Sequence, residues 1–476
     1  MNKLSILAGS LAAAATVQAA PKQPNIIFVL IDDLGKEWLS CYGGEGIKTP
    51  NIDKLAKGGI RFENAYSMPQ CTPSRVCLMT GQYPYKNGWI NHWDAPRWGT
   101  GYFDWKHNPS VARMMKSAGY TTAVAGKWQL NDFRVQPDAM VKHGFDDYCM
   151  WTGAESSKEK NHTKKSDKRY WNPYIHTKAG SKVYKGAFGP DVYNQFVLDF
   201  ITKNKQKPFF IYYPMALTHL PYTTTPLEKK VKSSKDKHKA MVRYTDHLLG
   251  KLTSHLDRLG IRDNTIIIWT CDNGTAHSIS NMRNGRKVVG GKTKTTENGV
   301  NTPFIVNCPG LVPAGRISKA LVDFTDMYKT FADFAGAPLE KGYEFDGHSA
   351  KDLFLGKDQN GARDWILAMG SLPAVLTDKG VESIYYFRDR VIRNKRFKLF
   401  VNTKGQPEKL IDVVNDLDEK NDLSKKPEFQ EVLKKFMAVV KTLPKKDNDP
   451  KYDVLPKNPW DKKGKTKSQV HKKDQP

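Results

Sequence analysis

The chain has 476 residues, of which 39% are hydrophobic and 11% aromatic, enough for a sizeable packed core and too much for wholesale disorder. The length suggests one large domain with a smaller one. Lysine and arginine number 75 against 49 acidic residues, giving a formal net charge of +26 that attracts polyanions. The six cysteines form no C-x-x-C pair, which disfavours zinc and a disulfide-framed scaffold but leaves one or two bridges open.

The first 19 residues have the pattern of a secretory signal peptide. Lys3 supplies a positive start, residues 4–17 are mostly apolar, and Val17-Gln18-Ala19 resembles a small-residue cleavage site. No later apolar run reaches the roughly 20 residues that cross a bilayer. We therefore expect an exported protein, periplasmic or secreted, without a membrane span. Outside the cytoplasm, a sulfated or carboxylated polysaccharide is a more available polyanion than nucleic acid, which we do not expect as a partner.

Four apolar runs that each end in a polar cluster predict strands buried on both faces. They begin at Asn25 ("NIIFVLIDDLG"), Thr121 ("TTAVAGKWQL"), Pro208 ("PFFIYYPMALTHLPY") and Asn264 ("NTIIIWTCDNG"). Helices that close on glycine are expected within residues 51–59, 108–120 and 238–260. This order predicts an α/β fold over residues 20–350, with a large, mostly parallel sheet flanked by helices.

The pattern changes from about residue 340. Residues 382–402 ("ESIYYFRDRVIRNKRFKLFVN") alternate apolar and charged side chains, as a half-exposed antiparallel sheet does, and residues 426–443 form an amphipathic helical pattern. We predict a smaller C-terminal α+β subdomain over residues 351–445. Residues 446–476 are rich in lysine and are expected to be a solvated basic tail.

Oxygen-bearing side chains follow two of the predicted strands. Asp32 and Asp33 end the first, and Asp272 and Asn273 end the fourth. Ligands bind at the carboxyl ends of parallel strands, and carboxylates gathered there repel one another unless a cation lies among them. Hard oxygen ligands suit Ca²⁺, or Mg²⁺ as the second choice. The alternative is that each pair only caps a turn.

Lys127 and His219 follow two other predicted strands, and Lys292 lies in "GGKTKTTENG". Lys127, His219 and Lys292 could together face the acidic pairs and form a pocket for an oxyanion, with His219 giving a proton to a leaving group. Solvated lysines and a structural histidine are the alternative.

The stretch "MPQCTPSRVCLMTG", residues 68–81, places a cysteine ahead of a short helix. Pro73 can start this helix, so Cys71 lies at a helix N-terminus, where free N–H groups favour negative charge. Arg75 in the first turn opposes the helix dipole and is expected to have an anionic partner. A thiolate matches a hard cation poorly, and an oxygen group would fit this position better.

The segment Cys71-Thr72-Pro73-Ser74-Arg75-Val76-Cys77-Leu78-Met79-Thr80-Gly81 resembles the hallmark of the formylglycine-dependent sulfatases of the alkaline phosphatase superfamily. That hallmark is Cys or Ser, any residue, Pro-Ser-Arg, four residues and Thr-Gly. "DDLG", "GKW", "THLPY", "CDNG", "GGK…ENG…P" and "LIDVVNDLDEKNDL" extend the similarity over nearly the whole mature chain. The resemblance implies an alkaline phosphatase-like fold and the hydrolysis of sulfate esters.

The resemblance also implies a role for each candidate residue. A formylglycine-forming maturation enzyme would oxidise Cys71 to 3-oxoalanine, whose hydrate supplies the nucleophilic hydroxyl. Asp32, Asp33, Asp272 and Asn273 would bind Ca²⁺ together with the modified Cys71. Arg75 and Lys127 would hold the hydrate, while His219 and Lys292 would bind the sulfate and assist the leaving group.

Two positions depart from the family pattern. Gln129 stands in Gly126-Lys127-Trp128-Gln129-Leu130, where the family usually has a histidine that helps to deprotonate the second hydroxyl. Glutamine cannot take a proton, so turnover is slow or another base, such as His277, replaces it. Asn301 stands where an arginine is common.

Two basic stretches are candidates for substrate binding. Residues 87–107 are rich in tryptophan, arginine and histidine, and residues 278–287 are basic. Aromatic faces stack on sugars, although half of these tryptophans are expected in the core. The candidate substrate-binding residues are Gln129, His92, Arg97, His277 and Arg283.

We therefore predict a sulfatase for a sulfated polysaccharide or its oligosaccharides, with an algal polymer such as carrageenan, fucan or ulvan preferred to a small aryl sulfate. The alternatives are a phosphoester or phosphonate hydrolase of the same superfamily and a non-catalytic polysaccharide-binding protein. The sugar, the sulfate position, exo or endo action and the oligomeric state stay open.

Overall fold

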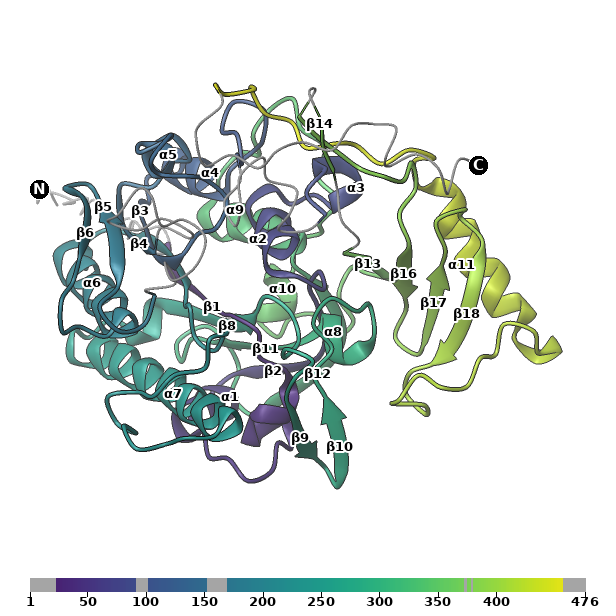
Figure 1. The fold of residues 1–476 in the computed structure, drawn as a ribbon, viewed down its shortest axis with the longest axis horizontal. Coiled ribbons are helices and arrows are strands. Elements are labelled where there is room, and N and C mark those ends of the chain that lie inside the picture. The colour runs from purple at the N-terminus through teal and green to yellow at the C-terminus, as the bar shows by residue number, and fades with distance from the viewer. Residues whose placement is uncertain (1–22, 91–101, 152–168, 372–374, 378–379, 457–476) are drawn as a thin grey trace, which may run out of the picture.

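A ten-stranded mixed sheet forms the centre of the protein, as seen in the computed structural model (Figure 1). The structure describes residues 23–90, 102–151, 169–371, 375–377 and 380–456, so the predicted signal peptide and residues 457–476 of the tail lie outside it. The strand order is β12-β2-β11-β8-β1-β7-β3-β4-β5-β6. The strands are β1 (Asn25–Ile31), β2 (Ile60–Tyr66), β3 (Thr121–Lys127), β4 (Asp147–Trp151), β5 (Tyr174–Thr177), β6 (Gly180–Val183), β7 (Phe209–Pro214), β8 (Thr265–Cys271), β11 (Asn301–Asn307) and β12 (Arg316–Asp323).

The middle of this sheet, β8-β1-β7-β3-β4, is parallel and contains all four strands predicted from the apolar runs. At one side β11 runs antiparallel to β8 and β2, and at the other β5 and β6 form an antiparallel edge. The prediction of a large, mostly parallel sheet is confirmed.

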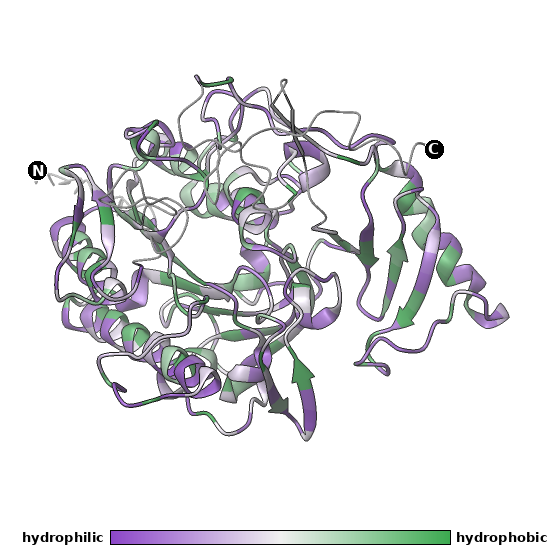
Figure 2. Ribbon diagram, viewed as in Figure 1, coloured by the Kyte–Doolittle hydropathy of each residue, from purple (hydrophilic) through white to green (hydrophobic). Residues whose placement is uncertain are grey.

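Helices cover both faces because the central strands are apolar on both sides. In β1, Ile27, Val29 and Ile31 belong to one core, and the alternating Ile26, Phe28 and Leu30 belong to the other. The first core packs on α1 (Pro50–Lys57), α6 (Gly189–Asn204) and α7 (Ser234–Arg258); the second packs on α2 (Cys71–Thr80), α4 (Val111–Ser117), α9 (Asp326–Ala335) and α10 (Lys351–Phe354). The hydropathy colours in Figure 2 show apolar and polar residues interleaved along α6 and α7, as expected for helices with one buried side.

A smaller C-terminal part lies to the right in Figure 1 and has its own four-stranded antiparallel sheet, β13-β16-β17-β18. Its elements are β13 (Ile366–Met369), β16 (Arg390–Arg393), β17 (Phe397–Val401), β18 (Pro407–Asp412) and the helix α11 (Gln430–Thr442). Phe436 and Val440 of α11 belong to the same core cluster as Leu399 and Leu410 of the sheet. The α+β character of this part is confirmed, and the boundary between residues 350 and 351 stays a prediction.

The remaining short elements connect these layers. They are α3 (Pro84–Asn87), α5 (Ala139–Lys142), α8 (Glu297–Val300), the hairpin β9 (Ser280–Arg283) and β10 (Arg286–Val289), the hairpin β14 (Val375–Thr377) and β15 (Gly380–Glu382), and the 3-10 turns η1 (Lys36–Trp38), η2 (Ser40–Tyr42), η3 (Arg262–Asn264) and η4 (Pro427–Phe429). All six cysteines are free. Within the described ranges, none of the helices combines the length and the apolar character that crossing a bilayer requires.

The start of the predicted tail packs on the rest of the chain. Asp447 is buried and receives two hydrogen bonds from Arg390, at 2.7 and 2.9 Å. Asp453 pairs with Lys106 and His107 on the surface. The start of the predicted tail is therefore held on the rest of the chain by ion pairs of its own aspartates, Asp447 and Asp453.

Candidate active site

The predicted site residues meet at the carboxyl ends of the central strands. Because β1 and β8 pair in parallel with Ile31 opposite Cys271, the residues that follow them, Asp32 and Asp272, are neighbours. Lys127 is the last residue of the nearby strand β3. All three side chains are buried. This is the edge at which open α/β sheets bind ligands.

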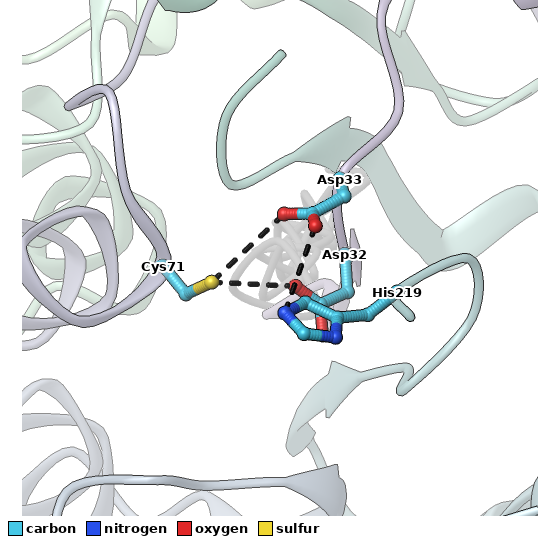
Figure 3. A group of neighbouring side chains, drawn as sticks. All are labelled: Asp32, Asp33, Cys71 and His219. Carbon is cyan, nitrogen blue, oxygen red and sulfur yellow. Dashed lines mark hydrogen bonds and ion pairs between the residues drawn. The ribbon is translucent and has the colours of Figure 1, made fainter. Parts of the chain in front are cut away.

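Cys71 lies at the centre of this group as the first residue of α2. Its Sγ is 3.5 Å from Asp32 Oδ1, 4.0 Å from Asp33 Oδ1 and 3.6 Å from Lys292 Nζ. Figure 3 shows the side chains of Cys71, Asp32, Asp33 and His219 pointing into one space. One ligand atom from each of these four lies within 4.8 Å of the others.

The N-terminal turn of α2 is fixed by Ser74 of the Pro-Ser-Arg segment. The Ser74 hydroxyl accepts a hydrogen bond from Met68 N at 3.0 Å and lies within hydrogen-bonding distance of the carbonyls of Gln70 and Asp272. The helix closes at Gly81, whose φ of +65° suits a residue without a Cβ. Ser74 thus connects the loop before Cys71 to the end of β8.

Arg75 has the anionic partner that its unfavourable place in the helix dipole predicts. Its Nη2 and Nε are 2.6 and 3.2 Å from Asp272 Oδ2, and its Nη1 donates to the carbonyl of Lys127 at 2.5 Å. The guanidinium is fully buried, where a carboxylate partner offsets much of its desolvation. Arg75 therefore connects the nucleophile helix to two strand ends.

Two lysines neutralise the first acidic pair. Lys127 Nζ is 2.6 Å from Asp32 Oδ2, and Lys292 Nζ is 2.7 Å from Asp33. Burial by itself would raise the pKa of Asp32, but Lys127 and the other cations around it outweigh burial and hold that pKa below its usual range. Burial and the nearby Asp32 raise the pKa of Asp272 to about 6. Asp32 and Asp272 thus differ in acidity.

His219 faces the group from the side opposite Cys71 (Figure 3). Its Nε2 is 3.6 Å from Asp33 Oδ2, and its Nδ1 lies 3.1 Å from Arg169 Nη1 and 2.7 Å from the Leu220 carbonyl. Burial and the Lys292 charge lower the pKa of His219 to about 3, although 22% of its side chain is exposed. An anion placed between His219 and Lys292 would raise that pKa again.

The donor set fits a hard cation. Asn273 donates from Nδ2 to Asp33 Oδ1 at 2.8 Å, while its own Oδ1 is buried and has no hydrogen-bond partner among the described residues. A buried amide oxygen left without a partner is uncommon and marks a place for a ligand. With the carboxylates of Asp32, Asp33 and Asp272, this oxygen completes the kind of site that Ca²⁺ or Mg²⁺ prefers.

The predicted substrate-binding residues are not gathered in the same way. Gln129 lies two residues after Lys127 with φ of +62°, and its Oε1 is buried without a partner within the described part of the chain. His277 is exposed on the loop after Asn273, and Arg283 donates from Nε to the Tyr42 carbonyl at 2.9 Å. His92 and Arg97 lie outside the described residues.

Two further observations bear on the sequence predictions. Trp89 and Trp105, from the tryptophan-rich stretch, pack in or against the hydrophobic core, as the alternative interpretation expected. Arg169 was not predicted from the sequence; it contacts His219 and stacks over Trp151 with 4.1 Å between the guanidinium carbon and the ring centroid. Arg169 follows a lysine-rich run and no strand end, so the sequence carried no signal for it.

Comparison with known proteins agrees with this geometry. Residues 24–337 match the family model "Sulfatase", and residues 291–446 match "N-sulphoglucosamine sulphohydrolase, C-terminal". N-acetylgalactosamine-6-sulfatase of Canis lupus familiaris is 33% identical over 360 residues, covering 71% of this chain and 67% of the relative. An ulvan-active sulfatase of Formosa agariphila is 28% identical over 441 residues, covering 87% of this chain and 79% of that protein.

Solved structures give the same result. The crystal structure of Ps i-CgsB has a TM-score of 0.71 at 27% identity, covering 88% of this chain and 93% of that chain. A second structure of that protein, with a TM-score of 0.71, is a complex with k-i-k-neocarrahexaose. Since the family model covers well over half of the sequence and the relatives align along most of it, the chain belongs to the sulfatase family of sulfuric ester hydrolases.

Proposed function

We propose that this protein hydrolyses sulfate esters of a sulfated glycan, with a formylglycine made from Cys71 and with one Ca²⁺ ion. The position of Cys71 carries the proposal: it begins α2 and lies 3.5 Å from Asp32 and 3.6 Å from Lys292. The raised thiol pKa, about 12 because of burial, makes the unmodified cysteine a poor nucleophile. The proposal includes export and a formylglycine-forming maturation enzyme.

Asp32, Asp33, Asp272 and Asn273 would hold the cation, with Mg²⁺ as the second choice. When bound, such an ion would supply positive charge that favours the ionised form of a neighbouring oxygen. Arg75 and Lys127 keep their own positions through Asp272 and Asp32, and so orient the side chain of residue 71. Fixed orientation of this kind lowers the entropic part of the barrier.

Lys292 and His219 would bind the ester itself. Lys292 Nζ lies near both Cys71 Sγ and Asp33, so a sulfate oxygen placed beside residue 71 would contact a fixed cation. His219 borders the same space and would hold a proton at the bridging oxygen of the departing alcohol. Both residues bind charge that grows on these oxygens as the ester bond breaks.

The substrate class is supported by what the related proteins are called. The relatives include an ulvan-active sulfatase and N-acetylgalactosamine-6-sulfatases, and a similar structure binds k-i-k-neocarrahexaose. We favour an algal polymer such as carrageenan, fucan or ulvan. A glycan with sulfated N-acetylgalactosamine is the second candidate, because several relatives carry that name.

The test is the release of free sulfate from a panel containing both kinds of glycan. The enzyme is co-expressed with a formylglycine-forming enzyme, mass spectrometry confirms the aldehyde at residue 71, and Cys71→Ala serves as the control. Release from one glycan that is absent in Cys71→Ala supports the proposal and names the substrate. Phosphate release from phosphoesters without sulfate release, or glycan binding equal in both proteins with no turnover, would overturn it in favour of the two alternatives.

A further inference from the structure

A polar cleft of about 540 Å³ lies beside the active-site loops, between the catalytic part and the C-terminal part. It is lined by the β9–β10 hairpin, α8, the turn that begins at Gly35, and residues 413–420 after β18. Figure 1 shows β10, α8 and β18 around this region. Lys294 of the lining follows Lys292 of the active site by two residues.

Three cationic side chains in this cleft have weak or no counter-charges. Lys36 is 5% exposed, and its Nζ donates to the Glu63 carbonyl and to Asn301 Oδ1, which is an amide. Within the described chain, no carboxylate oxygen lies within 4 Å of Lys36 or of Arg283. Arg393 is 3% exposed, and its Nη1 and Nη2 donate to the Asn394 carbonyl and to Asn64 Oδ1. Its Nε lies 3.6 Å from Glu297 Oε1 and has no hydrogen-bond partner among the described residues.

The acidic residues of the lining pair more closely with other groups, although Glu297 also lies 3.6 Å from Arg393 Nε. Lys398 pairs with Glu297 at 3.2 Å and with Glu419 at 2.8 Å. Glu63 pairs with Arg61, and Asp418 with Arg286 and Lys420. Glu37 is buried and bonded to Thr275, and burial raises its pKa. The cleft therefore has an excess of positive charge that the protein itself does not neutralise.

A buried cation without a counter-ion is unfavourable, and a bound anion would offset that cost. Burial and the Arg283 charge lower the pKa of Lys36 to about 7, in agreement with a missing counter-ion. Guanidinium groups offer several N–H donors in one plane, which suits the oxygens of a sulfate. Exposed Lys287 and Lys294 add positive charge at the rim.

We infer that this cleft is a binding site for a sulfate-type oxyanion, held by Lys36, Arg283 and Arg393. Its volume exceeds that of one sulfate and leaves room for a sugar. The anion has two sources: a second sulfate group on the glycan chain, or free sulfate released by the reaction. The first source rests on the proposed function, whereas binding of an oxyanion does not.

Selenate is the probe, because it has the shape and charge of sulfate and an anomalous signal. Crystals of the full chain grown without sulfate are soaked in selenate. We expect a selenium peak within hydrogen-bonding distance of Lys36 Nζ and Arg393 Nε, separate from any peak at Lys292. Lys36→Met should remove only the cleft peak. This change replaces a buried charge by an apolar chain of similar length, which such sites tolerate.

Arg283→Gln, on the hairpin side, is a second variant that should weaken the cleft peak, and Lys235→Met, an exposed lysine of α7, is the matched control that should keep it. The inference is overturned if selenate fills the site at Lys292 and leaves the cleft empty, or if the cleft peak survives in Lys36→Met. Either result says nothing against sulfate release in the glycan panel.

Kinetics on the matured enzyme distinguish the two sources. If a glycan sulfate occupies the cleft, Lys36→Met raises KM about tenfold or more for a multiply sulfated oligosaccharide, the usual effect of losing a charged hydrogen bond, with kcat and the KM of a monosulfated substrate unchanged. If free sulfate occupies it, the response of wild-type turnover to added sulfate shrinks in Lys36→Met. Both outcomes support an oxyanion site, and an unchanged response in both assays argues against it.

Discussion

Gln129 is the residue whose chemistry fits the proposed reaction least well. Its amide cannot accept a proton, yet it lies two residues after Lys127 with a buried Oε1 that has no partner among described groups. Its φ of +62° is a conformation that histidine tolerates better than most residues do. Gln129→His should therefore fit the backbone and introduce a base.

We expect kcat for sulfate release to rise about a hundredfold in Gln129→His, at the low end of what a positioned general base contributes. The gain in kcat should grow as the pH rises, because only the imidazole that has lost its proton can act as a base. Gln129→Asn also suits this backbone but adds no base, so its kcat should not rise. Equal kcat values in wild type and Gln129→His would show that proton transfer at this position does not limit turnover.

Calcium should stabilise the folded chain through the side chains of the predicted metal site. Asp32, Asp33 and Asp272 are buried together, and Asn273 Oδ1 lacks a partner within the described residues, so a bound ion relieves repulsion and an unsatisfied oxygen. Addition of Ca²⁺ at about 100 times its Kd should add about 2.7 kcal/mol to the free energy of unfolding.

The measurement is Tm after chelation and after return of Ca²⁺, in the Cys71→Ala background so that turnover plays no part. Asp33→Ala should have a Tm that responds much less to the ion. Glu431→Ala, an exposed acidic residue on α11, should respond as the parent does. A Tm that does not change with Ca²⁺ or Mg²⁺ in the parent would contradict the predicted metal site.

At the scale of elements, α8 connects the active-site loop to the C-terminal sheet. Four residues separate Lys292 from Glu297, and the Glu297 carboxylate accepts from Tyr66 Oη at 2.6 Å and lies 3.2 Å from Lys398 Nζ on β17. The same loop is hydrogen-bonded to the segment before the nucleophile and to the segment after the predicted metal ligands. Thr293 N donates to the Pro69 carbonyl, and Lys292 N donates to the Thr275 carbonyl. Glu297 is thus a candidate positioning residue for Lys292.

Glu297→Gln should lower the free energy of unfolding by about 1–3 kcal/mol, because it weakens a buried ion pair while Glu419 still partners Lys398. The KM for the sulfate ester should rise more than kcat falls, because the substitution displaces Lys292 and so weakens binding of the ester in the ground state. Glu431→Gln removes an exposed pair with Lys434 and should change stability by less than about 0.5 kcal/mol. Equal effects of the two substitutions would contradict a tethering role.

Local sequence predicts the parts of the site that depend on neighbours along the chain. Apolar runs with polar ends predicted β1, β3, β7 and β8. The unfavourable position of Arg75 in the helix dipole predicted an anionic partner, and that partner is Asp272. Contacts between distant residues were not predictable: Arg169 and His219 are 50 positions apart, and Glu297 and Lys398 are 101 apart. The strand β11 was not predicted, because Pro303 argues against a strand. In the structure this proline lies at a register shift.

At the scale of the whole molecule, buried histidines make folding sensitive to acid. His143 is fully buried, and its ring stacks on Phe103 with centroids 4.7 Å apart. Its Nε2 lies 2.9 Å from the Phe103 carbonyl, so the neutral ring can donate there. Burial and the Arg113 charge lower the pKa of His143 to about 3, against roughly 6.5 in an unfolded chain.

Because this folded-state pKa is depressed, the folded chain binds fewer protons than the unfolded chain between about pH 3 and 6.5. The stability contribution is complete above pH 6.5 and is lost as the pH falls toward 3. At pH 4.5 the loss from His143 alone should be about 3 kcal/mol, so His143→Gln, which keeps a donor for the Phe103 carbonyl, should flatten the decline in the free energy of unfolding between pH 7 and 4.5. Urea denaturation at both pH values measures this, with the exposed His277→Gln as control. If both variants decline as steeply as wild type, His143 is not the group that must take up a proton.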